Sequence, residues 1–397
     1  MASILTFAGF FAPHKGGAED VMNQTLEHLA RAGYNVDLIT CNTEKVFSHE
    51  ISNGVEIWRV PCWNMLHGTY PVPLPLPDTF RIVNKLFRKK HDAVYSYCRF
   101  YPSTFWAMVF SKMKRVPFVL IEFGTRHTVT DHKVVNFFGE IYDHTFGSIA
   151  VGSTTTLIGI CHATESFLAH IGGKNIVLIS PPTGLDMTIF KKNHTPLKQQ
   201  LGLQDKIVIS SVSRLIFAKG VQDLISAFPS IKEKTPNAVL IIVGDGPYKQ
   251  ELVNLANKID NKNIIFTGFK NAAEIADILN ISDVFVSPSY SEGLLAGTII
   301  EAGAIGIPSV ISDVGGAREI IQDRKNGLFV QPRDVSAIAE KVCELIHDKS
   351  LHSEISTNIS LLIHERWNWD NILPHYLREF SAVIDKENQT MELLSEK

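Results

Sequence analysis

The sequence predicts an α/β protein built from two doubly wound parallel-sheet domains in tandem. Two observations carry this prediction. Short β-rich runs alternate with helical patterns along the chain, as parallel strands joined by crossover helices require. The length of 397 residues also exceeds what one hydrophobic core usually organises, since domains commonly hold about 100 to 200 residues.

The first domain is expected at residues 1–180. Its predicted strands are Ser3–Phe7, Val36–Thr40, Val55–Val60, Ala93–Tyr97, Phe118–Glu122, Ser148–Val151 and Ile176–Ile179. A helix is expected over Glu19–Ala32, where apolar residues recur at helical spacing before Gly33. The proline-rich run Pro71–Pro77 is expected to be an extended loop.

The second domain is expected at residues 205–365, after an interdomain connection at 181–204. Its predicted strands are Ile207–Val212, Ala238–Val243, Ile264–Thr267, Val284–Pro288, Ser309–Ser312 and Gly327–Val330. A helix over 366–385 should pack back on the N-terminal domain, and 386–397 should be a frayed tail. Ligands bind beyond the carboxyl ends of parallel strands, so we expect a cleft between these two Rossmann-like domains.

Composition and charge exclude several classes of protein. With 45% apolar and 20% charged residues, the chain can bury large cores and is not disordered. A net charge of −3 argues against a bulk nucleic-acid binder. The five cysteines form no C-x-x-C motif, which indicates neither a zinc site nor a disulfide scaffold and fits a reducing cytoplasm. The N-terminus lacks a basic region, so we expect a first strand rather than a signal peptide.

Glycines and cations gather where predicted strands end. Gly16 and Gly17 precede the first helix, where glycines let the backbone approach an anion and the helix N-terminus offers free N–H groups. An ordinary strand-to-helix turn is the alternative. Arg214 and Lys219 follow a strand and suit two adjacent phosphates. Two solvated surface cations are the alternative.

A single carboxylate, Glu301, lies on an otherwise uncharged helix expected over 296–304. A buried carboxylate needs donor partners, and sugar or ribose hydroxyls are suitable. A purely structural hydrogen bond is the alternative.

Taken together, these motifs resemble those of glycosyltransferase family 4, the retaining nucleotide-sugar enzymes of GT-B fold, also called glycosyl transferases group 1. The resemblance covers almost the full length of the chain. The matching segments are Pro13–Glu19, Val212–Gly220, Gly244–Pro247, Thr267–Phe269, Ser291–Gly293, Glu301–Pro308, Gly315–Glu319 and Trp367–Trp369. Each segment is weak alone, and together they are specific.

The resemblance implies roles in binding the diphosphate of the donor and in catalysis. Gly16 and Gly17 would approach the donor pyrophosphate. Arg214 and Lys219 would neutralise it and stabilise charge on the departing nucleotide. The reaction would need neither a metal nor a cofactor besides the donor, and the sequence contains no Asp-x-Asp.

It also implies contacts to the rest of the donor. Glu301 would accept hydrogen bonds from the ribose hydroxyls. Glu292, with Gly293 and Leu294 after it, would contact the donor sugar. Thr267, Gly268 and Phe269 would lie beside the base.

Two of the departures from the family pattern concern candidate site residues. The family usually separates its two glutamates by seven residues, whereas eight lie between Glu292 and Glu301. Either a local bulge absorbs the extra residue, or Glu292 is not the true equivalent. A histidine often precedes the glycine that ends the fifth strand, but this chain has Glu122-Phe123-Gly124. We nominate His127 as a contact to the donor sugar or the acceptor, with a surface or structural histidine as the alternative.

A basic stretch between Arg81 and Arg115 does not depend on the resemblance. Its nine cations are Arg81, Lys85, Arg88, Lys89, Lys90, Arg99, Lys112, Lys114 and Arg115, against one acidic residue, Asp92. Leu86 and Phe87 interleave with the first cations, which predicts an amphipathic basic helix. Such a face would suit an anionic membrane surface or a phosphate-linked lipid acceptor. A solvated helix face is an equal alternative.

The sequence thus predicts a metal-independent, retaining, hexosyltransferase-like enzyme. It would move a sugar from a nucleoside diphosphate to a glycan or lipid-linked acceptor, in cell-surface polysaccharide or glycolipid biosynthesis. We expect it in the cytoplasm, peripheral at the inner face of the membrane if the basic stretch binds lipid, with no nucleic-acid partner. Two alternatives stay open: a GT-B nucleotide-sugar epimerase, and a non-catalytic two-lobed sugar-binding protein.

Overall fold

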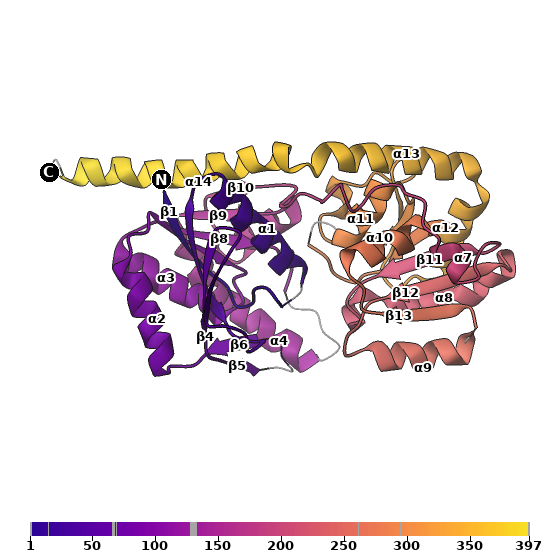
Figure 1. The fold of residues 1–397 in the computed structure, drawn as a ribbon, viewed down its shortest axis with the longest axis horizontal. Coiled ribbons are helices and arrows are strands. Elements are labelled where there is room, and N and C mark those ends of the chain that lie inside the picture. Colours follow the sequence, from indigo (N-terminus) through magenta and orange to yellow (C-terminus); the bar gives the residue numbers. More distant parts are fainter. Residues whose placement is uncertain are drawn as a thin grey trace. The chain divides into compact units, whose positions relative to one another are not determined.

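The computed structural model describes residues 2–14, 16–65, 68, 70–127, 133–260, 262–293 and 296–395 (Figure 1). The chain forms two compact units. Unit 1 comprises Met1–Thr128, Phe137–Thr183 and Trp369–Lys397, and unit 2 comprises Val129–Asn136 and Gly184–Asn368. Each unit contains a largely parallel sheet with helices against it, which confirms the predicted fold class.

The sheet of unit 1 has the strand order β10-β9-β8-β7-β1-β2-β4-β3. Its strands are β1 (Ser3–Phe7), β2 (Asn35–Cys41), β3 (His49–Ser52), β4 (Val55–Val60), β7 (Ala93–Tyr97), β8 (Phe118–Glu122), β9 (Thr156–Gly159) and β10 (Ile176–Leu178). Only the edge strand β3 pairs antiparallel. Consecutive side chains such as Ile4 and Leu5 point to opposite faces and both are fully buried, because helices cover the sheet on both sides.

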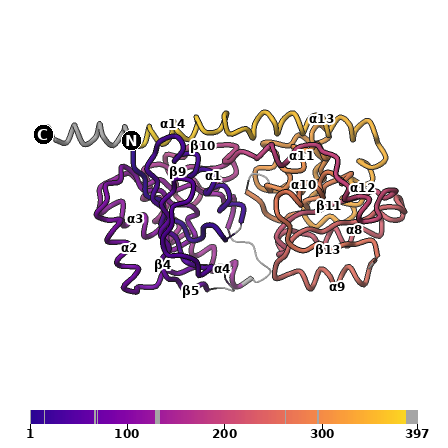
Figure 2. The backbone as a smooth tube through the Cα atoms, in the orientation of Figure 1, coloured from indigo at the N-terminus to yellow at the C-terminus, as the bar shows by residue number. Residues whose placement is uncertain are grey.

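One face of this sheet carries α1 (Gly17–Arg31) and the first part of α14 (Trp369–Ser395). The other carries α2 (Pro77–Arg88), α3 (Pro102–Lys114) and α6 (His162–His170). Figure 2 traces the chain from α13 (Lys349–Arg366) of unit 2 into α14. There Phe380 stacks on Tyr95 of β7 with ring centroids 4.2 Å apart. The C-terminal helix therefore completes the core of unit 1, and it runs through Ser395, past the expected end at 385.

Two predictions for unit 1 are corrected. Ser148–Val151 was expected as a strand, but α5 (Ser148–Gly152) is helical, and the strand is β9, which begins eight residues further on. The short apolar run fits a helix face as well as a strand, and it directly continues the helical turns of α4 (Lys133–Tyr142) and η1 (Asp143–Gly147). Pro71–Pro77 is no loop throughout: β6 (Tyr70–Pro73) pairs with β5 (Cys62–Met65), and Pro77 begins α2, as proline favours.

The sheet of unit 2 is parallel throughout, in the order β13-β12-β11-β14-β15-β16. Its strands are β11 (Ile207–Val212), β12 (Ala238–Val243), β13 (Ile264–Gly268), β14 (Val284–Ser287), β15 (Ser309–Ser312) and β16 (Leu328–Val330). Its longer helices are α8 (Val221–Lys234), α9 (Lys249–Ile259), α10 (Ala272–Asn280), α11 (Gly297–Ile305), α12 (Val335–His347) and α13. The strand order reverses between β11 and β14, so loops after these two strands flank the topological switch point where such sheets bind ligands.

Candidate active site

The predicted cation and glutamate motifs meet at the switch point of unit 2. Arg214 follows β11 and is exposed, and Lys219 ends the short turn η2 (Phe217–Lys219). Glu292 lies in the loop after β14, where its Oε1 is 2.5 Å from Nζ of Lys219. The backbone N–H of Tyr290 donates to the carbonyl of Ala218 at 2.8 Å, which ties the two loops together. The structure thus brings Lys219 and Glu292 into direct contact.

Two glycines make this close approach possible. Gly220 has φ +65°, and a Cβ there would lie 1.9 Å from the carbonyl oxygen of Pro288, so no side chain fits. Gly315 has φ +59°, and a Cβ there would lie 2.2 Å from the carbonyl oxygen of Gly293. The N–H of Gly316 donates to that same oxygen at 2.7 Å. The glycine motif after β15 therefore supports the loop that carries Glu292 and Gly293.

The remaining predicted donor contacts in unit 2 occupy different elements. Glu301 is partly buried on α11, between the buried apolar residues Ile300 and Ala302. Thr267 and Gly268 end β13, and the ring of Phe269 beyond them is 58% exposed. Leu294 lies outside the described residues. Their assigned roles remain predictions.

A hydrogen-bond chain beside Glu292 escaped the sequence analysis. The hydroxyl of Tyr290 donates to Asp223 at 2.8 Å and accepts from Gln222 at 2.7 Å, while the guanidinium of Arg333 lies 4.8 Å from the ring centre. Burial raises the pKa of Asp223, and burial with the Asp223 contact raises the pKa of Tyr290. The neutral phenol therefore fixes the loop after β14 to the start of α8. No local pattern pairs residues 67 positions apart.

In unit 1, Gly16 precedes the first residue of α1 in extended conformation, and Gly17 has open space around it. Arg59 holds the preceding turn, because its Nη2 donates to the carbonyl of Ala12 at 2.8 Å. The carboxylate of Glu19 lies against Gly16 in the first turn of the helix, where negative charge is favourable.

His127 follows β8 and is held by a buried ionic network. Arg99 donates from Nε and Nη2 to Asp143 at 2.9 and 3.0 Å, and its Nη1 lies 3.1 Å from Glu122. All three side chains are at most 6% exposed. His127 contacts Asp143 through Nδ1 at 2.7 Å and keeps 27% of its side chain exposed.

The predicted basic stretch exposes fewer cations than the sequence indicates. Arg99 is buried, Lys89 pairs with Asp37 and Glu56 at 2.8 and 2.6 Å, and Lys114 donates to two backbone carbonyls. Leu86 is 1% exposed in the core of unit 1, so it is unavailable to a membrane. The cations that remain exposed are Arg81, Lys85, Arg88, Lys90, Lys112 and Arg115. No helix in the described part of the chain is long and apolar enough to span a bilayer.

Two doubly wound α/β units, one with cations at its switch point, define the GT-B class of architecture. The solved structure of HepE from Anabaena in complex with UDP-glucose agrees, with a TM-score of 0.76 at 19% identity over 96% of this chain and 100% of that chain. Residues 15–186 match the family described as Glycosyltransferase Family 4, and residues 193–360 match Glycosyl transferases group 1. The chain belongs to these glycosyltransferases.

Named relatives agree with this membership. An uncharacterised glycosyltransferase of Methanocaldococcus jannaschii is 26% identical over 96% of this chain and 99% of its own length. A Mycobacterium tuberculosis GDP-mannose-dependent alpha-(1-6)-phosphatidylinositol monomannoside mannosyltransferase is 30% identical over 55% of this chain and 60% of its own. The protein is therefore a transferase, which disfavours both the epimerase and the non-catalytic binding protein.

Proposed function

We propose that the protein is a retaining glycosyltransferase that uses a nucleoside-diphosphate sugar and no metal or further cofactor. The observation that carries this proposal is the Lys219–Glu292 pair at the switch point of unit 2, with the exposed Arg214 in the same segment after β11 as Lys219. An exposed guanidinium and a positioned ammonium together suit a diphosphate leaving group.

The charges at this site favour bond cleavage. As the bond from sugar to diphosphate breaks, negative charge grows on the departing oxygen, and Lys219 and Arg214 stabilise it. Among the described residues, no carboxylate lies within ion-pair distance of Arg214, so its charge is available to a phosphate. Glu292 keeps Lys219 in place until the donor arrives, and its carboxylate can then accept hydrogen bonds from sugar hydroxyls.

The proposed acceptor is a glycan or a lipid-linked sugar at the inner face of a membrane. The phosphatidylinositol mannoside named for the M. tuberculosis relative is a lipid-linked sugar, which supports this class. The UDP-glucose held by HepE and the GDP-mannose named for the mannosyltransferase support a nucleoside-diphosphate sugar as the donor. We assign His127 a contact with the sugar or acceptor through its exposed edge.

A donor screen with product analysis tests the proposal. UDP-, GDP- and ADP-sugars are first ranked by thermal shift, since a ligand at 100 times its Kd stabilises the folded protein by about 2.7 kcal/mol. The best donor is then incubated with glycan and lipid-linked acceptors, with and without EDTA. We expect a product whose new bond keeps the anomeric configuration of the donor, formed equally well with EDTA.

Three outcomes contradict the proposal. Inversion at the anomeric carbon rules out retention, and loss of turnover in EDTA rules out metal independence. Donor isomerised without any acceptor indicates the epimerase.

A further inference from the structure

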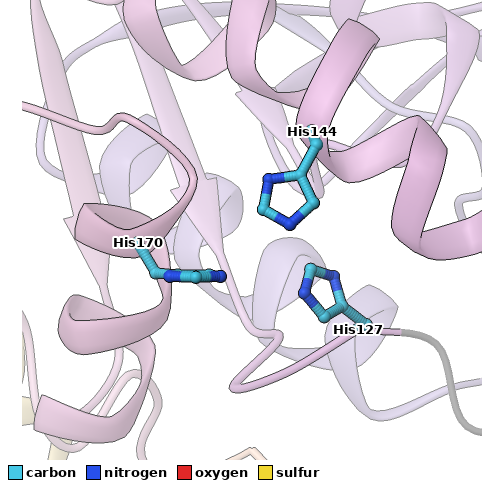
Figure 3. A group of neighbouring side chains, drawn as sticks. All are labelled: His127, His144 and His170. Atoms are coloured by element: carbon cyan, nitrogen blue, oxygen red, sulfur yellow. The ribbon is translucent and has the colours of Figure 1, made fainter.

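Three histidines of unit 1 converge on one point (Figure 3). They are His127 after β8, His144 in η1 and His170 at the end of α6. One ring nitrogen from each lies within 4.8 Å of the corresponding nitrogens of the other two. The ring centroids are 5.2 to 6.1 Å apart, and the rings are tilted or edge-on to one another rather than stacked.

Asp143 orients the least exposed of the three rings. Its Oδ2 lies 2.7 Å from Nδ1 of His127, so Nδ1 donates to the carboxylate and Nε2 is the ring nitrogen that would face a metal. A carboxylate on one ring nitrogen and a metal on the other is the usual arrangement of metal-binding histidines. Arg99 fixes Asp143 in turn by its two hydrogen bonds at 2.9 and 3.0 Å.

The charge around the cluster favours a cation. Arg99 supplies one formal positive charge against the two buried carboxylates of Glu122 and Asp143, so a second cation beside Asp143 would balance the pair of carboxylates. A buried excess charge needs compensation nearby. A metal ion on the far side of the His127 ring would provide it.

The local backbone also brings the ligands together. Asp143 and His144 are neighbours in the π-helical turn η1, with Asp143 fully buried and His144 exposed. Single π turns are rare and recur at functional sites. One turn therefore supplies both an inner orienting carboxylate and an outer ligand.

We propose that His127, His144 and His170 bind a divalent transition metal of the Zn²⁺ class. Three imidazoles suit Zn²⁺ and its neighbours in the first transition row, and leave a fourth position open to water or an anion. Tetrahedral nitrogens at 2.0–2.1 Å from zinc lie about 3.4 Å apart. His144 and His170 are exposed and can turn inward by the distance required, while His127 stays fixed by Asp143.

The metal would use the same edge of His127 as the sugar or acceptor contact proposed above, so only one of the two can occupy that edge. The metal site is not part of the diphosphate site of unit 2, whose proposed chemistry uses no metal. Its test therefore measures metal binding itself. The full-length chain, stripped with EDTA and dialysed, is titrated with ZnCl₂ by calorimetry. CoCl₂ is added in parallel, because the visible absorption of bound Co²⁺ reports coordination number.

We expect one tight zinc per chain and a four-coordinate Co²⁺ spectrum. His144→Gln and His170→Gln, both at exposed positions, should each lower the zinc affinity. The loss should exceed the roughly 10-fold that removal of a carboxylate partner of a ligand costs. His162→Gln, at the other end of α6, is the matched control and should bind as the parent does. Asp143→Asn should weaken zinc by about 10- to 100-fold, judged only if its circular dichroism matches that of the parent.

Two results overturn the proposal. One is a parent chain that binds zinc no tighter than the His144→Gln/His170→Gln double variant. The three histidines would then only pack against one another and would not bind a metal. The other is a loss of affinity in His162→Gln as large as in the ligand variants, which indicates non-specific binding to surface histidines.

Discussion

Lys219 and Glu292 form an ion pair with a 2.5 Å separation although they are 73 positions apart in the sequence. They meet because β11 and β14 are neighbours and because Gly220 lets their loops touch. The ammonium is therefore in position before a donor binds, which reduces the entropy that binding must overcome.

Replacing either phosphate-site cation should impair catalysis. Lys219→Ala and Arg214→Ala should each lower kcat/KM by about 10²-fold or more, since each removes a contact that strengthens as the diphosphate leaves. Steady-state kinetics measure the effect. Lys249→Ala removes a lysine of unit 2 paired with Asp245 and should leave kcat/KM unchanged. Parental rates in both site variants would place the phosphate site elsewhere.

The two glutamates should separate nucleotide binding from turnover. Glu301→Gln should lower the affinity for the free nucleoside diphosphate by roughly 10-fold, which corresponds to the loss of one charged hydrogen bond. Glu292→Gln should instead lower turnover or change sugar preference. Calorimetry with the diphosphate decides, with Glu340→Gln on the exposed side of α12 as the control. Unchanged affinity in Glu301→Gln would remove Glu301 from the ribose site.

Tyr290→Phe should destabilise unit 2 in a pH-dependent manner. The hydroxyl donates to Asp223, and a hydrogen bond to a charged group is worth about 1.5–3 kcal/mol when buried, with less expected at this half-buried carboxylate. Burial raises the pKa of Asp223 above its ordinary value of 3.8.

The raised pKa of Asp223 sets how its contribution to stability changes with pH. The folded state binds the Asp223 proton more tightly than the unfolded state, so this carboxyl favours folding at low pH, and the contribution is lost as pH rises through the raised pKa. The hydrogen bond from the Tyr290 hydroxyl stabilises the ionised carboxylate of Asp223 more than the protonated carboxyl. The melting-temperature gap between parent and Tyr290→Phe should be wider at pH 7 than at pH 4, with Tyr248→Phe as control. An equal gap at both values would contradict the ionic role of Asp223.

The exposed cations of α2, together with Lys90 two residues beyond its end, should bind anionic membranes. Each is worth about 1 kcal/mol near such a surface, and salt should weaken the binding. Replacing Lys85, Arg88 and Lys90 by Gln should abolish sedimentation with anionic vesicles. Lys89 is left intact because it holds Asp37 and Glu56. The control replaces Lys258, Lys262 and Lys349, all exposed in unit 2. A parent chain that ignores these vesicles at low salt would indicate a merely solvated face.

Local patterns predicted most of the fold. Buried strands such as Ala238–Val243 are bounded by turn residues and read alike in sequence and structure. Ser148–Val151 failed because a short apolar run fits either a strand or a helix. The sheet order, with its reversal between β11 and β14, depends on contacts that no local window contains.

For the candidate site too, the sequence predicted the residues within local motifs but not the contacts between distant segments. Lys219 and Glu292 stood out because each lies in a compact motif with glycines. The Asp223–Tyr290 contact and the Asp143 partner of His127 escaped, because hydrogen bonds between distant segments leave no spacing to read. Lys89 and Leu86 were misplaced for a related reason: a periodic pattern shows that a helix has two faces, but not which neighbour covers each.

The placement of α14 makes the order of synthesis matter. Tyr376 and Phe380 fill the core of unit 1, yet the ribosome adds them after the whole of unit 2. During translation the first unit keeps apolar surface uncovered until residues 369–397 are made, whereas the second unit is complete once residue 368 has been added and can fold first. Cutting the gene at residue 183 therefore yields an incomplete first half, and fusing 369–397 to residues 1–183 through a short linker is the way to produce that half alone.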